Sequence, residues 1–279
     1  RRRHTRLLTV TGVQTCALPI SILVNNDAFD RVSDFLRPEH FSEELHRRIF
    51  ETGAQLIRAG KLATVVTLKT FLADIELPAG ITIQAYLARL AAEANLTGAP
   101  MKPQRAYPEI NKVLPKNCMV TIDAGICPGL AYDRFSYDLP RSVFNYAGHG
   151  GLGMGLCVGL GTKLGRPERP AMSIQGDGGF MYSIQELNTA VRFKIPHVSI
   201  VLNNGCHGSE KAQQLRFWNS KYIAVDLDNP RFDMAAEVFG AKGFYAERPQ
   251  DIAGAVQAAF DCGGPAVVEI PVKIGRAHV

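Results

Sequence analysis

Two short apolar runs on either side of a helix-like stretch constrain the fold of this chain more than any other feature. Ala171–Gln175 is apolar and ends at glycines, and Val198–Leu202 is a second run rich in β-branched residues. Residues 181–193 between them place their apolar side chains on one helical face. A strand–helix–strand unit of this kind brings both strand carboxyl ends to the same edge of a parallel sheet. The sequence therefore predicts an α/β fold with a mostly parallel sheet.

Polar residues follow both predicted strands at that edge. Gly176-Asp177-Gly178 follows the first strand, and Asn203-Asn204 lies 27 residues further on. The Asp177 carboxylate and the Asn204 amide oxygen are ligands of the kind that Mg²⁺ prefers, and Mg²⁺ often completes its shell with substrate phosphates. A lone Gly-Asp-Gly commonly marks only a turn. The two motifs at this spacing, with glycines that let the backbone approach a phosphate, predict a Mg²⁺–diphosphate site.

These motifs resemble the signature of thiamine diphosphate-dependent enzymes, in particular the acetolactate synthase and sulfoacetaldehyde acetyltransferase branch. The resemblance runs from about Pro103 to Pro271 and includes V-T-I-D-A-G at 120–125, the glycine-rich stretch 148–155 and L-G-R-P-E-R-P-A-M-S-I-Q-G-D-G-G-F at 164–180. It implies a three-layer α/β/α sandwich over residues 103–271. It also implies a lyase or transferase that binds thiamine diphosphate through Mg²⁺ and acts on a 2-oxo acid or an aldehyde.

The resemblance assigns roles to individual residues. The metal ligands would be the side chains of Asp177 and Asn204 and the backbone carbonyl of Cys206. Leu152 would be the bulky apolar residue that bends the cofactor, and the backbone of Gly150 would meet its aminopyrimidine ring. The remaining cofactor-binding residues would be Gly125, Ile126, Gly176, Gly178, Gly179 and His207. His149 and His207 are also candidates for acid–base catalysis, but the sequence shows no partner for either of them.

A dinucleotide-binding oxidoreductase is an alternative. Gly148-x-Gly150-x-x-Gly153 matches the dinucleotide fingerprint. Only a short apolar run, Val143–Tyr146, precedes this motif, and no acidic residue ends a strand about 20 residues later, as the fingerprint requires. His197, which follows a proline at the start of a predicted strand, is interpreted as a structural residue.

Residues 21–98 differ from the rest of the chain in their pattern of apolar residues. Apolar residues recur at helical spacing over 41–57 with Ser42 as an N-cap, a second helix is expected over Thr82–Ala94, and Leu77–Gly80 marks a break. These patterns predict a small all-α helical bundle. The run I-L-V-N-N-D-A-F-D-R-V-S-D-F-L-R-P-E-H-F at 22–41 resembles the N-terminal domain of bacterial replicative DNA helicases. That resemblance implies a module for hexamer assembly and primase contact as the alternative function, without the ATP-binding P-loop motif.

Both ends of the chain are interpreted as translated sequencing adapter. One oligonucleotide read in opposite orientations can encode both Cys16–Ile20 and Ile274–His278, so residues 1–20 and 273–279 are excluded from fold reasoning. The chain has 31 Lys and Arg against 26 Asp and Glu, and without these ends 25 basic residues remain. The net charge of +5 is then no argument for nucleic-acid binding. The excluded basic residues are Arg1, Arg2, Arg3, Arg6, Lys273 and Arg276.

The order of the segments predicts a chimeric chain. A helicase-like fragment is followed by the C-terminal third of a carboligase-like enzyme, whose family supplies the activating glutamate from a separate pyrimidine-binding domain, usually across a homo-oligomer interface. We find no such domain in the sequence and expect the isolated chain to be inactive; an assembly error without function is a further alternative. Six cysteines without C-x-x-C spacing indicate reduced thiols and a cytoplasmic protein. No apolar stretch of 18 residues predicts a membrane span.

Overall fold

The computed structural model describes residues 37–40, 44–61, 63, 76–77, 81–82, 92, 96–98, 100–135, 137, 139–145 and 150–273. The chain forms two compact units: the first comprises residues 1–92 and 137–140, and the second comprises residues 93–136 and 141–279. Within the described ranges, no helix is long and apolar enough to cross a membrane.

Among the described residues of the first unit are the helix α3, at Glu44–Arg58, and before it the short 3-10 helix η1 at Pro38–His40. The helix confirms the expected periodicity after residue 41, while its expected cap, Ser42, lies outside the described residues. Two strands that the helical prediction did not include, β1 (Glu76–Leu77) and β2 (Ile81–Thr82), pair in antiparallel fashion. Thr82 is therefore not the first residue of a helix, because it pairs with Glu76 in this short ladder.

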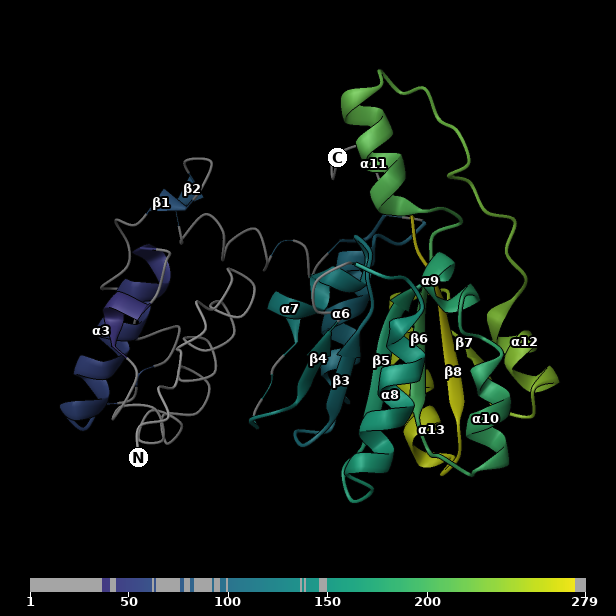
Figure 1. The fold of residues 1–279 in the computed structure, drawn as a ribbon, viewed down its shortest axis with the longest axis horizontal. Helices are drawn as coiled ribbons and strands as arrows, with labels where there is room; N and C mark the ends of the chain where they lie inside the picture. Colours follow the sequence, from purple (N-terminus) through teal and green to yellow (C-terminus); the bar gives the residue numbers. More distant parts are fainter. Residues whose placement is uncertain are drawn as a thin grey trace, which may run out of the picture. The chain divides into compact units, whose positions relative to one another are not determined.

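The second unit is built on a parallel six-stranded sheet in the described part of the chain, with strand order β4-β3-β5-β6-β8-β7 (Figure 1). Two of these strands, β5 and β6, confirm the apolar runs predicted at Ala171–Gln175 and Val198–Leu202. The edge strand β4 is additional and uses the short run that begins at Val143. The strands are β3 (Met119–Ile122), β4 (Val143–Asn145), β5 (Ala171–Gly176), β6 (Val198–Asn203), β7 (Lys242–Tyr245) and β8 (Ala266–Pro271).

Helices cover both faces of the sheet and confirm the three-layer arrangement. On one face, α8 (Met154–Gly165), α10 (Glu186–Arg192) and α12 (Phe232–Val238) form an apolar core with the sheet. The members of this core include Leu156, Leu187, Val201, Phe232 and Val267. On the other face, α13 (Pro249–Asp261) packs on β8 and against α6 (Pro103–Asn111), and Figure 1 shows α8 and α13 on opposite sides of the strands.

The helix expected over 181–193 is divided, which corrects the prediction. The structure has α9 at Asp177–Met181, a turn over residues 182–185 and then α10. In the turn, the Glu186 N–H donates to the Ser183 carbonyl at 2.9 Å, and Ser183 is buried. The continuous apolar stripe concealed this break because Leu187 and Ala190 still face the core on the second segment.

Three further helical segments had no clear periodic signal. These are η2 at Pro128–Leu130, α7 at Ala131–Arg134 and α11 at Gly208–Phe217. None of the ten residues of α11, all of which the structure describes, is buried. A helix without a buried face lacks the apolar repeat by which an amphipathic helix is recognised.

His197, interpreted as structural, lies immediately before β6 with only 2% of its surface exposed. Its Nδ1 lies 3.3 Å from the Ser199 hydroxyl, and its Nε2 lies against Gly159 of α8, where a Cβ would come within 2.2 Å. Burial lowers the pKa of His197 from 6.5 to about 3. The folded protein therefore keeps this imidazole neutral under conditions in which the unfolded chain protonates it.

This difference predicts a pH-dependent stability. Because the unfolded state binds the extra proton below pH 6.5, the stabilisation is complete above that pH and is lost as the pH falls toward 3. The expected loss is about 1.4 kcal/mol per pH unit in this window. Urea denaturation at pH 7.5 and 5.5 should show a drop larger by about 1.4 kcal/mol in the unchanged protein than in His197→Gln. Equal pH dependence in the two proteins would contradict the assignment.

Candidate functional site

A cleft of about 200 Å³ lies at the carboxyl edge of β3, β5 and β6. It brings together every described residue that was predicted to bind the metal or the cofactor. The binding role of each of these residues stays a prediction. These lining residues are Gly125, Ile126, Gly150, Leu152, Gly176, Asp177, Gly178, Gly179, Asn204, Cys206 and His207. His149, the other candidate acid–base residue, lies outside the described residues.

Asp177 is the buried carboxylate of this cleft. It directly follows β5, is 1% exposed, and its Oδ2 accepts a hydrogen bond from Asn229 Nδ2 at 2.7 Å. Burial raises the pKa of the Asp177 carboxyl, while hydrogen bonds from Asn229 and from neighbouring backbone N–H groups partly offset that increase. A carboxylate held in this way favours a bound cation, because an opposite charge stabilises its ionised form.

Asn204 and Cys206 follow β6 and are held by local hydrogen bonds. Asn204 Oδ1 accepts the Cys206 N–H at 3.2 Å, and its Nδ2 donates to Cys127 Sγ at 3.6 Å. An amide oxygen has a second lone pair, so this bond leaves Asn204 able to bind a cation. Cys206 forms a β-bridge with Asp226. The two hydrogen bonds of that bridge are made by the backbone groups of the residues that flank Cys206 and Asp226, and the Cys206 carbonyl takes no part in them.

Glycines shape the cleft because side chains at these positions would fill it or collide. A Cβ on Gly178 would lie 2.7 Å from the His207 ring, and a Cβ on Gly179 would lie 2.4 Å from Asp123 Oδ2. A Cβ on Gly176 would meet only Pro128, at 4.0 Å. The backbone after β5 can therefore come close to a ligand such as a diphosphate.

Asp123 is a residue that the sequence reasoning did not assign to the site. It follows β3, is fully buried, and its carboxylate accepts the N–H groups of Gly153 at 3.1 Å and Met154 at 3.2 Å. These bonds fix the turn that carries Gly150 and Leu152 to the cleft. Its position in the sequence could have indicated this role, because a polar residue directly after a parallel strand lies at the ligand-binding edge of the sheet.

The same bonds weigh against the dinucleotide alternative. A dinucleotide pyrophosphate would need the N–H groups at the start of the helix after the glycine motif. At the start of α8, two of those groups already donate to the buried Asp123 carboxylate. A second anion there would face a carboxylate.

The donor chemistry suits Mg²⁺. Among the described residues, no group of three His, Cys, Asp or Glu side chains is placed to hold a metal ion. The candidate set consists instead of one carboxylate, one amide oxygen and one backbone carbonyl. Such an oxygen set, completed by phosphate and water, fits Mg²⁺ better than it fits Zn²⁺, which favours nitrogen and sulfur.

Residues 123–270 match the model of the thiamine pyrophosphate enzymes, specifically their C-terminal TPP binding domain. Residues 17–101 match the DnaB-like helicase N terminal domain, a match that begins within the segment interpreted as adapter. The two matches agree with the two resemblances drawn from the sequence.

Similar proteins align with about three fifths of the chain. Sulfoacetaldehyde acetyltransferase of Alcaligenes xylosoxydans xylosoxydans is 33% identical over 177 residues, and acetolactate synthase of Bacillus subtilis is 33% identical over 187 residues. These alignments cover 62% and 64% of this chain but only 29% and 32% of the relatives. The crystal structure of benzoylformate decarboxylase from Polynucleobacter necessarius superposes with a TM-score of 0.60 at 25% identity, covering 63% of this chain and 34% of the other.

Proposed function

The chain belongs to the thiamine pyrophosphate enzyme family through its C-terminal TPP binding domain, and we propose that residues 103–271 hold the diphosphate of thiamine diphosphate through Mg²⁺. The observation that carries this proposal is the convergence of Asp177 and Asn204, which follow adjacent parallel strands, on one glycine-lined cleft. By name, the relatives are a transferase, a synthase and a decarboxylase.

In this proposal each part of the cleft has one task. Asp177, Asn204 and the Cys206 carbonyl hold the metal, and the glycine backbone together with His207 lies against the diphosphate. Leu152 and Gly150 support the rings of the cofactor. The cofactor supplies an electron sink for making or breaking a bond beside a carbonyl group, in a substrate that we propose to be a 2-oxo acid or an aldehyde.

A pyrimidine-binding domain is the partner that we propose for this unit, within a cytoplasmic homo-oligomer. The chain spans about a third of the length of the curated relatives it matches. The cleft volume of about 200 Å³ lies below the roughly 300–1,000 Å³ of a complete small-molecule site. A wall supplied by another domain would enclose the remainder of the cofactor and bring the activating glutamate.

Calorimetry tests the core of the proposal. Thiamine diphosphate should bind the chain weakly when Mg²⁺ is present and should not bind measurably after EDTA treatment, because the metal links two groups of negative charge. NAD serves as the matched ligand for the oxidoreductase alternative. Binding of NAD but not of thiamine diphosphate, or metal-independent binding of thiamine diphosphate, would contradict the proposal.

The match over residues 17–101 favours a second candidate function, in assembly or primase contact of a replicative helicase. We propose that the two parts come from different genes that were joined in this chain. Amplification across residues 85–115 from the source DNA tests the junction. One uninterrupted product would show a single gene and contradict the chimera, whereas separate products for the two halves would support it.

A further inference from the structure

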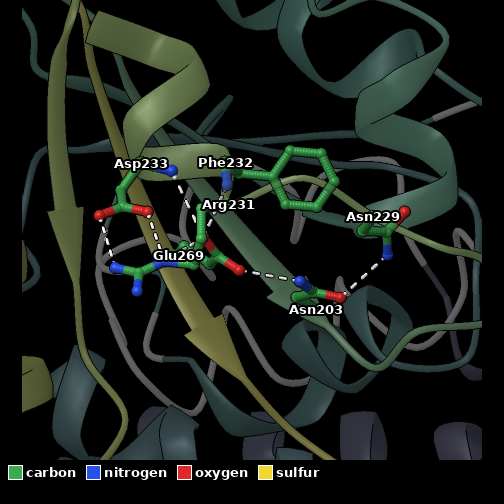
Figure 2. Close-up of polar contacts among 6 residues, drawn as sticks. All are labelled: Asn203, Asn229, Arg231, Phe232, Asp233 and Glu269. Carbon is green, nitrogen blue, oxygen red and sulfur yellow. Dashed lines mark hydrogen bonds and ion pairs between the residues drawn. The ribbon is translucent and has the colours of Figure 1, made fainter.

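A buried glutamate outside the cleft is the start of a polar relay that reaches the cleft. Glu269 lies on β8 and is 2% exposed. Its Oε2 accepts the backbone N–H of Phe232 at 2.7 Å, and its Oε1 accepts Asn203 Nδ2 at 2.8 Å (Figure 2). Both carboxylate oxygens are therefore used, one by the start of α12 and one by the end of β6.

The relay continues from Asn203 through Asn229 to Asp177. Asn203 Oδ1 accepts from Asn229 Nδ2 at 3.0 Å, as Figure 2 shows, and also from the Gly205 N–H at 3.2 Å. Asn229 Nδ2 donates in addition to Asp177 Oδ2 at 2.7 Å. We call Glu269, Asn203 and Asn229 the Glu269 relay.

The donor direction of this relay is fixed by a backbone group. The Gly205 N–H can only donate, so the Asn203 oxygen faces it and the NH₂ group of Asn203 faces Glu269. The Asn203 oxygen must then point to Asn229, which has to present its NH₂ group. That group has two hydrogens, one for Asn203 and one for Asp177. A flip of either amide would place like groups against each other, and the network therefore specifies one arrangement.

Resting on the proposed metal function, we propose that the Glu269 relay consists of positioning residues that set the orientation of the Asp177 carboxylate for the cation. The relay joins three separate segments, β8, the end of β6 and the loop before α12, and Asn229 of that loop makes the bond to Asp177. Partners of this type behind a metal ligand typically change metal affinity 10–100-fold when they are removed. Nothing in the sequence motif that marks the metal site points to Asn229 or Glu269, which lie 25 and 65 residues beyond Asn204.

Electron paramagnetic resonance of Mn²⁺ tests the relay without an activity assay. Mn²⁺ favours oxygen ligands as Mg²⁺ does, and the signal of the free ion falls as it binds. The full chain would be titrated with Mn²⁺ at a fixed concentration of thiamine diphosphate. Asn229→Leu and Glu269→Gln should each weaken Mn²⁺ binding about 10–100-fold. Glu269→Gln is the sharper variant, because it keeps the shape of the side chain and replaces one acceptor oxygen with a donor.

Two control variants separate positioning from general destabilisation. Asn188→Leu makes the same substitution at an exposed site on α10 and should leave the Mn²⁺ affinity within about twofold of the unchanged protein, as surface substitutions do. Ile252→Val trims a buried residue of α13, remote from the cleft lining, and should lower the melting temperature with no comparable loss of affinity. A loss of affinity in Glu269→Gln no larger than in Ile252→Val would overturn the relay.

Asp177→Ala distinguishes the two levels of the proposal. If it abolishes Mn²⁺ binding while Asn229→Leu and Glu269→Gln bind normally, the metal site stands and the relay is wrong. If Asp177→Ala itself binds Mn²⁺ normally, the metal function is wrong and the relay falls with it. Loss in all three variants with normal binding in both controls supports both.

Discussion

Asp177→Ala should abolish Mg²⁺-dependent binding of thiamine diphosphate, with a loss of roughly 100-fold or more. A loss of this size is expected because removing a residue behind a metal ligand already lowers metal affinity 10–100-fold. Asp177→Ala removes the only carboxylate of the candidate ligand set itself. Calorimetric titration with Mg²⁺ present is the measurement. Asp261→Ala, at an exposed position in the last turn of α13, is the matched control and should bind as the unchanged protein does.

The Asp177→Ala variant should remain folded without metal. Burial raises the pKa of the Asp177 carboxyl, so its ionised form does not stabilise the metal-free fold. Thermal denaturation in EDTA should therefore show a melting temperature close to that of the unchanged protein. Unchanged affinity in this variant would contradict the metal assignment, and unfolding in EDTA would show that the carboxylate is a structural group.

Gly153→Ala should have the largest effect on stability. Gly153 has φ +83°, a left-handed conformation that costs other residues about 1–2 kcal/mol. The added Cβ would also lie 2.7 Å from Tyr182 Cβ and 3.3 Å from the Gly179 carbonyl oxygen. Overpacking of this kind costs about 1–3 kcal/mol, so urea denaturation should show a loss of about 2–5 kcal/mol. Thiamine diphosphate binding should fall as well, because this turn carries Leu152 to the cleft.

Gly161→Ala is the matched control on the same helix, α8. A Cβ there meets nothing within 4 Å, and its backbone is helical. The substitution should stabilise the protein by about 0.5–1 kcal/mol, since alanine favours a helix more than glycine does. Similar stabilities for Gly153→Ala and Gly161→Ala would mean that the turn relaxes and does not constrain the cleft.

The parts of the fold that the sequence predicted are those whose signal is local. The apolar runs of β5 and β6 are each nearly continuous because both faces of these strands are buried. Since parallel strands end at one edge, Asp177 and Asn204 could be placed together without a structure. Their spacing, with glycines beside Asp177, sufficed to propose the chemistry.

The parts that could not be predicted depend on contacts between distant segments. Asn229 reaches Asp177 across 52 positions, and Glu269 reaches Asn203 across 66. Asn229 lies in a loop, where asparagine is common for other reasons. Glu269 is a charged residue within an apolar strand. That position marks it as an exception in the sequence, but it does not indicate which groups the carboxylate contacts. The helix α11 escaped prediction because its ten residues have no buried face.

The strand order β6-β8-β7 has a consequence for the making of this protein on the ribosome. The edge of β6 is completed by Ala266–Pro271, which is synthesised more than 60 residues after β6 itself. Until that segment emerges, β6 presents unpaired N–H and C=O groups, which are a template for association with other chains. The same late segment brings Glu269, so the nascent domain can form β3, β5 and β6 well before Asn203 can donate its hydrogen bond to Glu269. A pause in translation before residue 266 should therefore leave a species that is open to aggregation and is retained by chaperones.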